Sequence, residues 1–388
     1  MVDFNKVINR KGTNSVKWDE ILETYQEDDL LPLWVADMDF KAPAAVLKAF
    51  HHSADLGIFG YQATPDSLYT AIIEWHRSQH QLELNKDEII FFSGVLAGLT
   101  TALQAFTQKD EAVLIHDPVY PPFSSIVENN QRKLVRSPLK KVGNNYQMDL
   151  ADMEEKIKQH QVKVMILCNP HNPGGRVWTK KELEALGKLC QKYQVIVFSD
   201  EIHQDLVFQP NRMTNFLSVD KDFSAFTIQF TSMTKTFNLA GIKNSLVFVK
   251  DPSLRETLQQ KQEENFQQEI NTFGLLGMEA AYTHGHEWLE ELLQYLKENI
   301  DFTLNFFADE LPKAKIMEPE GTYLLWIDFS AYGFSDEELM ELLVHKGKVL
   351  LNAGISYGPA GKQHMRLNAA CPRDTLQEGL SRIVQALS

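Results

Sequence analysis

Lys235 is the residue of this sequence with the clearest chemical potential, because of its neighbours. It lies in the stretch Thr231–Gly241, which follows an apolar run and contains the hydroxyl residues Ser232 and Thr234, with a second cation at Lys243 just beyond. An apolar run that changes abruptly to hydroxyl residues and a lysine is typical of a strand end that delivers side chains into a site. The lysine is either an ordinary solvated cation or an amine that forms a Schiff base with a carbonyl. Hydroxyls and a second cation would suit a phosphate beside that amine, which suggests pyridoxal phosphate (PLP).

Two further predicted strands end in polar residues that could meet this lysine. The apolar run Val195–Phe198 is followed by the carboxylate of Asp200, and the run Val164–Cys168 is followed by Asn172. Strands that alternate with helices predict a mostly parallel α/β sheet, in which ligands bind at the carboxyl ends of the strands. The three side chains are therefore expected to converge on one site.

The sequence resembles the fold-type I PLP enzymes of the aspartate-aminotransferase superfamily, since Asn172, Asp200 and Lys235 match the superfamily's motifs. Four longer stretches resemble the aminotransferase-like C–S lyases, meaning cystathionine β-lyases and cysteine-S-conjugate β-lyases. They are Trp34–Phe40, Asp200–Leu206, Lys235–Gly241 and Met365–Arg373. The resemblance implies an aspartate-aminotransferase-like α/β fold, with a large PLP-binding domain over 46–285 and a smaller α+β domain formed by 1–45 and 286–388.

The resemblance also implies the roles of the catalytic residues. Lys235 would carry the cofactor and later remove the α-proton of the substrate, and Asp200 would pair with the pyridine nitrogen so that the ring accepts electrons. Asn172 would bind the phenolic oxygen, and the ring of Tyr120 would lie over the pyridine ring unless it is a core tyrosine. His203 stands where many relatives have a tyrosine, and it is either a second partner of the cofactor or a packing residue.

The remaining contacts implied by the resemblance concern the phosphate and the substrate. The phosphate would be held by the amides of Val95 and Leu96, by Ser232, Thr234 and Lys243, and by Tyr61 of the neighbouring subunit in a homodimer. The alternative for Tyr61 is a half-buried aromatic. The substrate would contact Ala36, Asp37 and Asn172, and its α-carboxylate would bind Arg366, for which a structural salt bridge is the alternative.

The expected reaction is the α,β-elimination of L-cystathionine and related cysteine thioethers to pyruvate, ammonia and a thiol, as in methionine biosynthesis. Because the same cofactor residues serve transamination, an aminotransferase is the first alternative and a regulatory protein that keeps the fold is the second.

Composition limits the other possibilities. The chain has 388 residues, 44% of them hydrophobic, and a formal net charge of −14, which argues against nucleic acid and anionic membranes as partners. No signal-peptide pattern or membrane-length apolar run is present, and three scattered cysteines do not predict disulfides, so we expect a cytoplasmic protein. Neither the Asp37/Asp39 pair nor the His284/His286 pair offers enough ligands for a metal site.

Overall fold

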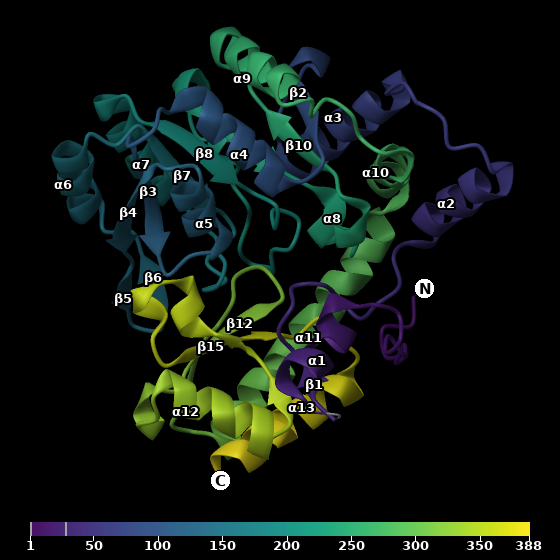
Figure 1. Ribbon diagram of the computed structural model, residues 1–388, viewed down its shortest axis with the longest axis vertical. Coiled ribbons are helices and arrows are strands. Elements are labelled where there is room, and N and C mark those ends of the chain that lie inside the picture. Colours follow the sequence, from purple (N-terminus) through teal and green to yellow (C-terminus); the bar gives the residue numbers. More distant parts are fainter. Residues whose placement is uncertain (1, 28) are drawn as a thin grey trace.

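A seven-stranded sheet forms the core of the larger lobe of the computed structural model, which describes residues 2–27 and 29–388 (Figure 1). The strand order is β2-β10-β9-β8-β7-β3-β4. All neighbours are parallel except β10, which is antiparallel to both β2 and β9. The bounds are β2 Ile89–Phe92, β3 Ala112–Asp117, β4 Lys133–Pro138, β7 Val164–Cys168, β8 Ile196–Asp200, β9 Thr227–Thr231 and β10 Ser245–Phe248. This arrangement confirms the predicted fold class.

Helices cover the sheet, which explains why its central strands are almost continuously apolar: both faces are buried. The helices of this part are α2 Ala44–Leu56, α3 Asp66–His80, α4 Val95–Phe106, α5 Pro122–Asn129, α6 Leu150–His160, α7 Lys180–Tyr193, α9 Pro252–Glu264 and α10 Thr272–His284. A capping box opens α7, because Thr179 accepts a hydrogen bond from the Glu182 amide and Glu182 accepts one from the Thr179 amide.

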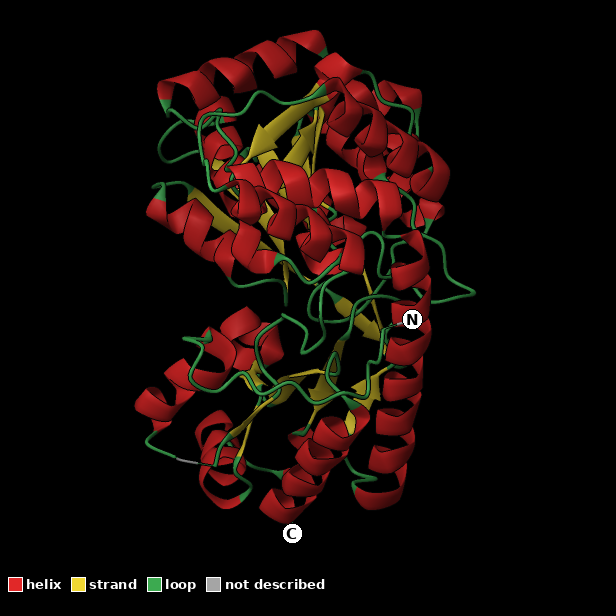
Figure 2. Cartoon of the chain, turned by 90° about the vertical axis from the view of Figure 1, so that its right-hand side faces the viewer, coloured by secondary structure: helices red, strands yellow, loops and turns green. Residues whose placement is uncertain are grey.

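The smaller lobe is built on a four-stranded antiparallel sheet in the order β11-β12-β15-β14, and it lies below the larger lobe in Figure 2. Its elements are α11 His286–Glu310, β11 Lys315–Met317, β12 Leu324–Asp328, α12 Asp336–Glu341, β14 Asn352–Ala353, β15 His364–Asn368 and α13 Arg373–Leu387. The N-terminal segment joins this lobe after the short helix α1 (Ile21–Tyr25), since β1 (Leu31–Pro32) pairs in parallel with β13 (Val349–Leu350). The predicted domain boundary falls between α10 and α11, and it stays a prediction.

One expectation about the helices was wrong. The sequence after the 244–249 strand predicts a helical region to about Leu311 with a single break at 283–286, but a second break separates α9 from α10 at residues 265–271. Phe266 there has a positive φ of 53°, which ends the helix, and Asn271 starts the next one by accepting a hydrogen bond of 2.8 Å from the Gly274 amide.

The predicted turn at Gly143–Asn145 joins a small hairpin of β5 (Lys140–Val142) and β6 (Asn145–Gln147). Among residues 2–27 and 29–388, no helix is both long enough and apolar enough to cross a membrane.

Candidate active site

A cavity of about 560 Å³ opens at the carboxyl ends of β7 and β8, where the small lobe and the N-terminal segment meet the large sheet. It brings together most of the side chains that the sequence singled out. The predicted residues that line it are Ala36, Val95, Leu96, Tyr120, Asn172, Asp200, His203, Thr234, Lys235, Lys243 and Arg366.

Lys235 lies on the single-turn helix α8 (Met233–Thr236), immediately after β9. Its Nζ donates a hydrogen bond of 2.7 Å to the main-chain oxygen of Ala36. Burial and the Arg366 guanidinium lower the pKa of Lys235 to about 8, although Asp37 and Asp200 act in the opposite direction. The amine is thus much closer to its neutral, nucleophilic form near pH 7 than a surface lysine is.

Asp200 ends β8 and is almost fully buried, with 3% of its surface exposed. Burial raises the pKa of its carboxyl to about 7, although the Ile202 amide, at 3.1 Å from Oδ1, and the Lys235 charge lower it. No ion pair to this carboxyl is present among the described residues, and a protonated pyridine nitrogen would supply one.

Arg366 reaches the cavity from β15, and within residues 2–27 and 29–388 its hydrogen bonds go to neutral oxygens. Its Nη1 donates to Oδ1 of Asn172 at 3.1 Å and its Nη2 donates to the main-chain oxygen of Trp34 at 2.8 Å. Its Nε has no hydrogen-bond partner among the described residues, and its guanidinium lies 5.3 Å from the ring centre of Tyr357. A buried guanidinium in this state calls for an anion, which a substrate carboxylate supplies.

The opposite end of the cavity is suited to a phosphate. Helix α4 begins there at Val95, and no side chain caps its first turn, so its first amides are available to an anion. Lys243 adds a positive charge, and Thr234 adds a hydroxyl. Ser232 does not line the cavity: its hydroxyl donates to the Asn244 main-chain oxygen at 2.7 Å, and it caps α8.

Tyr120 and His203 complete the walls. Burial and the nearby Asp200 charge raise the pKa of Tyr120 to about 12, so its hydroxyl stays protonated. Burial and the charge of Lys235 lower the pKa of His203 to about 3, and its Nδ1 has no partner among the described residues. His203 is therefore a neutral imidazole beside the amine.

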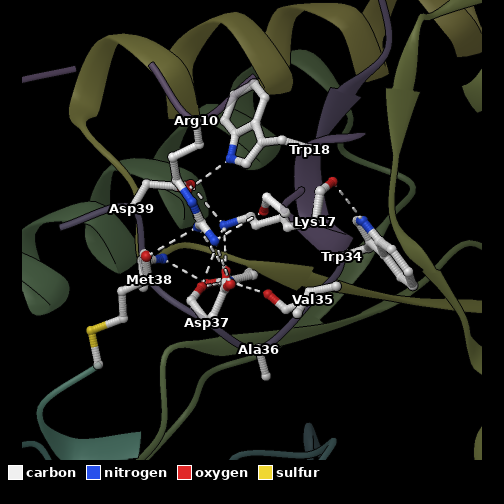
Figure 3. Close-up of polar contacts among 12 residues, drawn as sticks. Arg10, Lys17, Trp18, Trp34, Val35, Ala36, Asp37, Met38 and Asp39 are labelled. Carbon is white, nitrogen blue, oxygen red and sulfur yellow. Dashed lines mark hydrogen bonds and ion pairs between the residues drawn. The ribbon is translucent and has the colours of Figure 1, made fainter. Parts of the chain in front are cut away.

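Besides Ser232, two more predicted residues lie outside the cavity. Tyr61 is 98% exposed on the connection between α2 and α3. Asp37 points into a cluster of charges in the N-terminal segment, where Arg10 binds it at 2.7 Å (Figure 3). Within the described ranges 2–27 and 29–388, no group of three or more His, Cys, Asp or Glu residues is arranged to hold a metal ion.

Several contacts were not found from the sequence. Asn352 lines the cavity and donates to the Trp34 main-chain oxygen at 2.8 Å, and Tyr323 donates to the Ala36 main-chain oxygen at 2.9 Å. Both come from the small lobe. Their roles depend on how that lobe meets the N-terminal segment, for which the sequence has no local signal.

These features together fit PLP. One cavity holds an amine for the aldehyde, a buried carboxyl with a single backbone donor for the pyridine nitrogen, and a helix N-terminus with a lysine for the phosphate. The Arg366 side chain beside them leaves room for the carboxylate of an amino-acid substrate.

Comparison with known proteins agrees with this description. Residues 28–383 match the family model described as aminotransferase class I and II. The chain is 42% identical over 387 residues to the cystathionine β-lyase PatB of Bacillus subtilis, covering 100% of both chains.

Two PLP-bound crystal structures are also similar. One is a candidate aminotransferase of Clostridium difficile 630, with a TM-score of 0.98, 43% identity and 100% of both chains covered. The other is a C–S lyase of Staphylococcus hominis, with a TM-score of 0.93, 30% identity, 99% of this chain covered and 98% of that one.

Proposed function

Because the chain belongs to the aminotransferase class I and II family, we propose that it is a PLP-dependent carbon–sulfur β-lyase acting on L-cystathionine and related cysteine thioethers. The observation that carries the proposal is that one cavity holds both a buried arginine, whose Nε has no partner among the described residues, and an amine of lowered pKa. An α-amino acid needs both, one for its carboxylate and one for its α-proton. The C–S lyase motifs and the names of the relatives favour elimination.

When bound, PLP supplies an aldehyde for covalent attachment and a conjugated ring that withdraws electrons from the α-carbon of the substrate. Lys235 would hold the aldehyde in the resting enzyme, and Asp200 would bind the pyridine nitrogen. Asn172 and His203 would contact the phenolic edge of the ring, and Tyr120 would lie on its face. The phosphate would rest on the Val95 and Leu96 amides with Thr234 and Lys243, and with Ser232 behind them.

The residues of the chain then perform the remaining tasks. Arg366 would hold the α-carboxylate as a bidentate pair, with Ala36 and Asp37 near the mouth of the site. The neutral amine of Lys235 would take the α-proton and pass it on when the thiolate leaves Cβ. With water, the elimination of L-cystathionine gives pyruvate, ammonia and homocysteine.

The test is a product assay. L-Cystathionine should yield pyruvate, ammonia and thiol in equal amounts without any keto-acid acceptor. A requirement for 2-oxoglutarate or pyruvate, with an amino acid that lacks a β leaving group as best substrate, would make the protein an aminotransferase.

A homodimer is part of the proposal. The connection around Tyr61 carries several exposed apolar side chains, which favour a protein partner over water. They are Leu56, Ile58, Phe59 and Tyr61, with 67%, 70%, 60% and 98% of their surface exposed. We propose that a second copy of the chain covers them and that Tyr61 donates its hydroxyl to the phosphate of that copy.

Hybrid dimers test this arrangement. Mixing Tyr61→Phe with Lys235→Ala should restore activity, because one site of the hybrid has both native residues. Two copies of Lys235→Ala are the matched control. A fully active monomer in sedimentation would contradict the dimer. The cytoplasmic location stays a proposal that rests on composition and on three free, buried cysteines.

A further inference from the structure

The main-chain oxygen of Ala36 is a meeting point in the site that the catalytic scheme does not use. It accepts a hydrogen bond of 2.7 Å from Nζ of Lys235 and one of 2.9 Å from the hydroxyl of Tyr323. Tyr323 is fully buried and does not line the cavity, so it reaches neither cofactor nor substrate directly. Its hydroxyl can act on the lysine only through this carbonyl group.

The turn that carries the Ala36 carbonyl is held on both sides. Asn368 donates to the main-chain oxygens of Val35 and Asp37, at 2.6 Å and 2.7 Å. Trp34 is held by Arg366 at 2.8 Å. The carbonyl between them therefore has little freedom to turn away.

A buried ion cluster fixes the far end of the turn (Figure 3). Asp39 is 4% exposed and receives Lys17 at 2.7 Å, Arg10 at 2.7 Å and the Trp18 indole at 3.0 Å. Ala36 lies away from these charges in the view, at the end of the turn that faces the cavity. The ion cluster therefore anchors the turn, and the Ala36 carbonyl is the group of the turn that contacts Lys235.

We propose that Tyr323 is a positioning residue for Lys235, which holds the Ala36 carbonyl so that the amine has one fixed acceptor whenever it is released from the cofactor. A lysine side chain has four rotatable bonds, so its amine can adopt many positions. An amine that must take a proton from one atom benefits from being held in one orientation. The proposal rests on the proposed role of Lys235 as the base, but not on which reaction follows proton removal.

The charges that face the amine come from several elements. They are Arg366 on β15, Lys243 beyond α8, Asp200 at the end of β8 and Asp37 in the N-terminal turn. The titratable imidazole of His203 also lies beside the amine, in its neutral form. Burial raises the pKa of Tyr323 well above its usual value, so its hydroxyl remains a donor throughout the working pH range. The Ala36 oxygen binds an ammonium more strongly than a neutral amine. Tyr323, by donating to the same oxygen, limits that preference.

The test compares Tyr323→Phe with the native enzyme loaded with PLP. Loss of one hydrogen bond should lower kcat about 3- to 10-fold, with KM changed less than about twofold. The primary isotope effect on kcat with α-deuterated substrate should increase. The ascending limb of the kcat profile should move up by about 0.5 pH unit, which is a threefold change in the equilibrium of the amine.

Tyr146→Phe is the matched control, because Tyr146 is also buried and its hydroxyl accepts a hydrogen bond of 3.0 Å from the Trp326 indole, outside the cavity. It should lose stability without moving the isotope effect or the pH profile. An unchanged isotope effect and pH profile in Tyr323→Phe, or a change confined to KM, overturns the proposal.

A second measurement separates this inference from the proposed function. Exchange of the α-proton of L-alanine with deuterated water requires the base but no β leaving group. Slower exchange in Tyr323→Phe supports the positioning role even if cystathionine is not cleaved. Equal exchange rates in both enzymes contradict that role whatever the reaction is.

Discussion

The N-terminal ion cluster and the active-site cavity bury the same kinds of charged group, but only the cluster satisfies them within the chain. Asp39 is surrounded by Lys17, Arg10 and Trp18. Asp200, equally buried, has one backbone donor at 3.1 Å, and the Nε of Arg366 has no partner among the residues that the structure describes.

As a result, the carboxyl pKa is shifted in opposite directions in the two regions. Burial raises the pKa of Asp39, but Lys17, Trp18 and Arg10 outweigh it, so the net pKa lies below the usual range; the pKa of Asp200 lies above it. Complete partnering stabilises a structure, and incomplete partnering in a cavity reserves groups for a ligand.

The largest expected effect comes from removing the cavity's amine. Lys235→Ala should lose activity by at least about 10⁴-fold, because the covalent attachment and the base are lost together. In the native enzyme, borohydride reduction followed by peptide mass spectrometry should locate the pyridoxyl group on Lys235. Finding the pyridoxyl group on another lysine would show that Lys235 is not the residue that binds the cofactor.

Removing the carboxyl of Asp200 should have the next largest effect. Asp200→Ala should still bind PLP but exchange the α-proton about 10²- to 10³-fold more slowly, since the charge that supports electron withdrawal is gone. Asp200→Glu should be affected less. Deuterium exchange followed by NMR measures this, and near-normal exchange in the alanine variant would show that Asp200 is only a buried acid.

Breaking the satisfied cluster should show first as a loss of folding stability. Asp39→Asn should lower the free energy of unfolding by about 3 kcal/mol, because the buried Lys17 loses its main counter-ion, as urea titration would measure. The exposed pair of Asp66 and Lys86 is the control, and Asp66→Asn should change stability little.

The same variant has a pH signature. A depressed folded pKa adds stability above the unfolded pKa of about 3.9, and this stability is lost as the pH falls through the folded pKa. The native protein should therefore lose this contribution below about pH 4, and Asp39→Asn should lack that part of the slope. An identical pH dependence in both proteins would contradict the cluster's role.

The smallest effect concerns substrate binding. Arg366→Lys keeps the charge but loses the bidentate geometry, so KM should rise about 10-fold or more while the cofactor spectrum is retained. Steady-state kinetics measure this. A variant with unchanged KM would mean that the carboxylate binds elsewhere.

Which parts of this site could be predicted depends on whether the signal is local. Asn172, Asp200 and Lys235 follow apolar strands, and parallel strands bring their ends together whatever else the chain does. Tyr323 and Asn352 act through carbonyls of the N-terminal segment, so their contacts exist only after distant parts of the chain have met. Ser232 illustrates local competition, because its hydroxyl serves the helix that carries Lys235.

Only the acidic residues of the ion cluster were noticed in the sequence. Asp37 and Asp39 were noticed as a pair, but Arg10 and Lys17 gave no periodic signal that they would turn inward. The pairing of charges across an irregular segment depends on its path, which propensities do not encode. The break between α9 and α10 was missed for a related reason, since no proline or glycine marks it.

The pairing of β1 with β13 has a consequence for biosynthesis. The turn that supplies the Ala36 carbonyl follows β1, and both are translated long before β13, with which β1 pairs. Contacts of such long sequence separation form late, because the intervening loop must close first. The nascent segment around β1 therefore waits for β13, and a product truncated before Leu350 should contain Lys235 but lack Asn352 and Arg366, which line the same cavity.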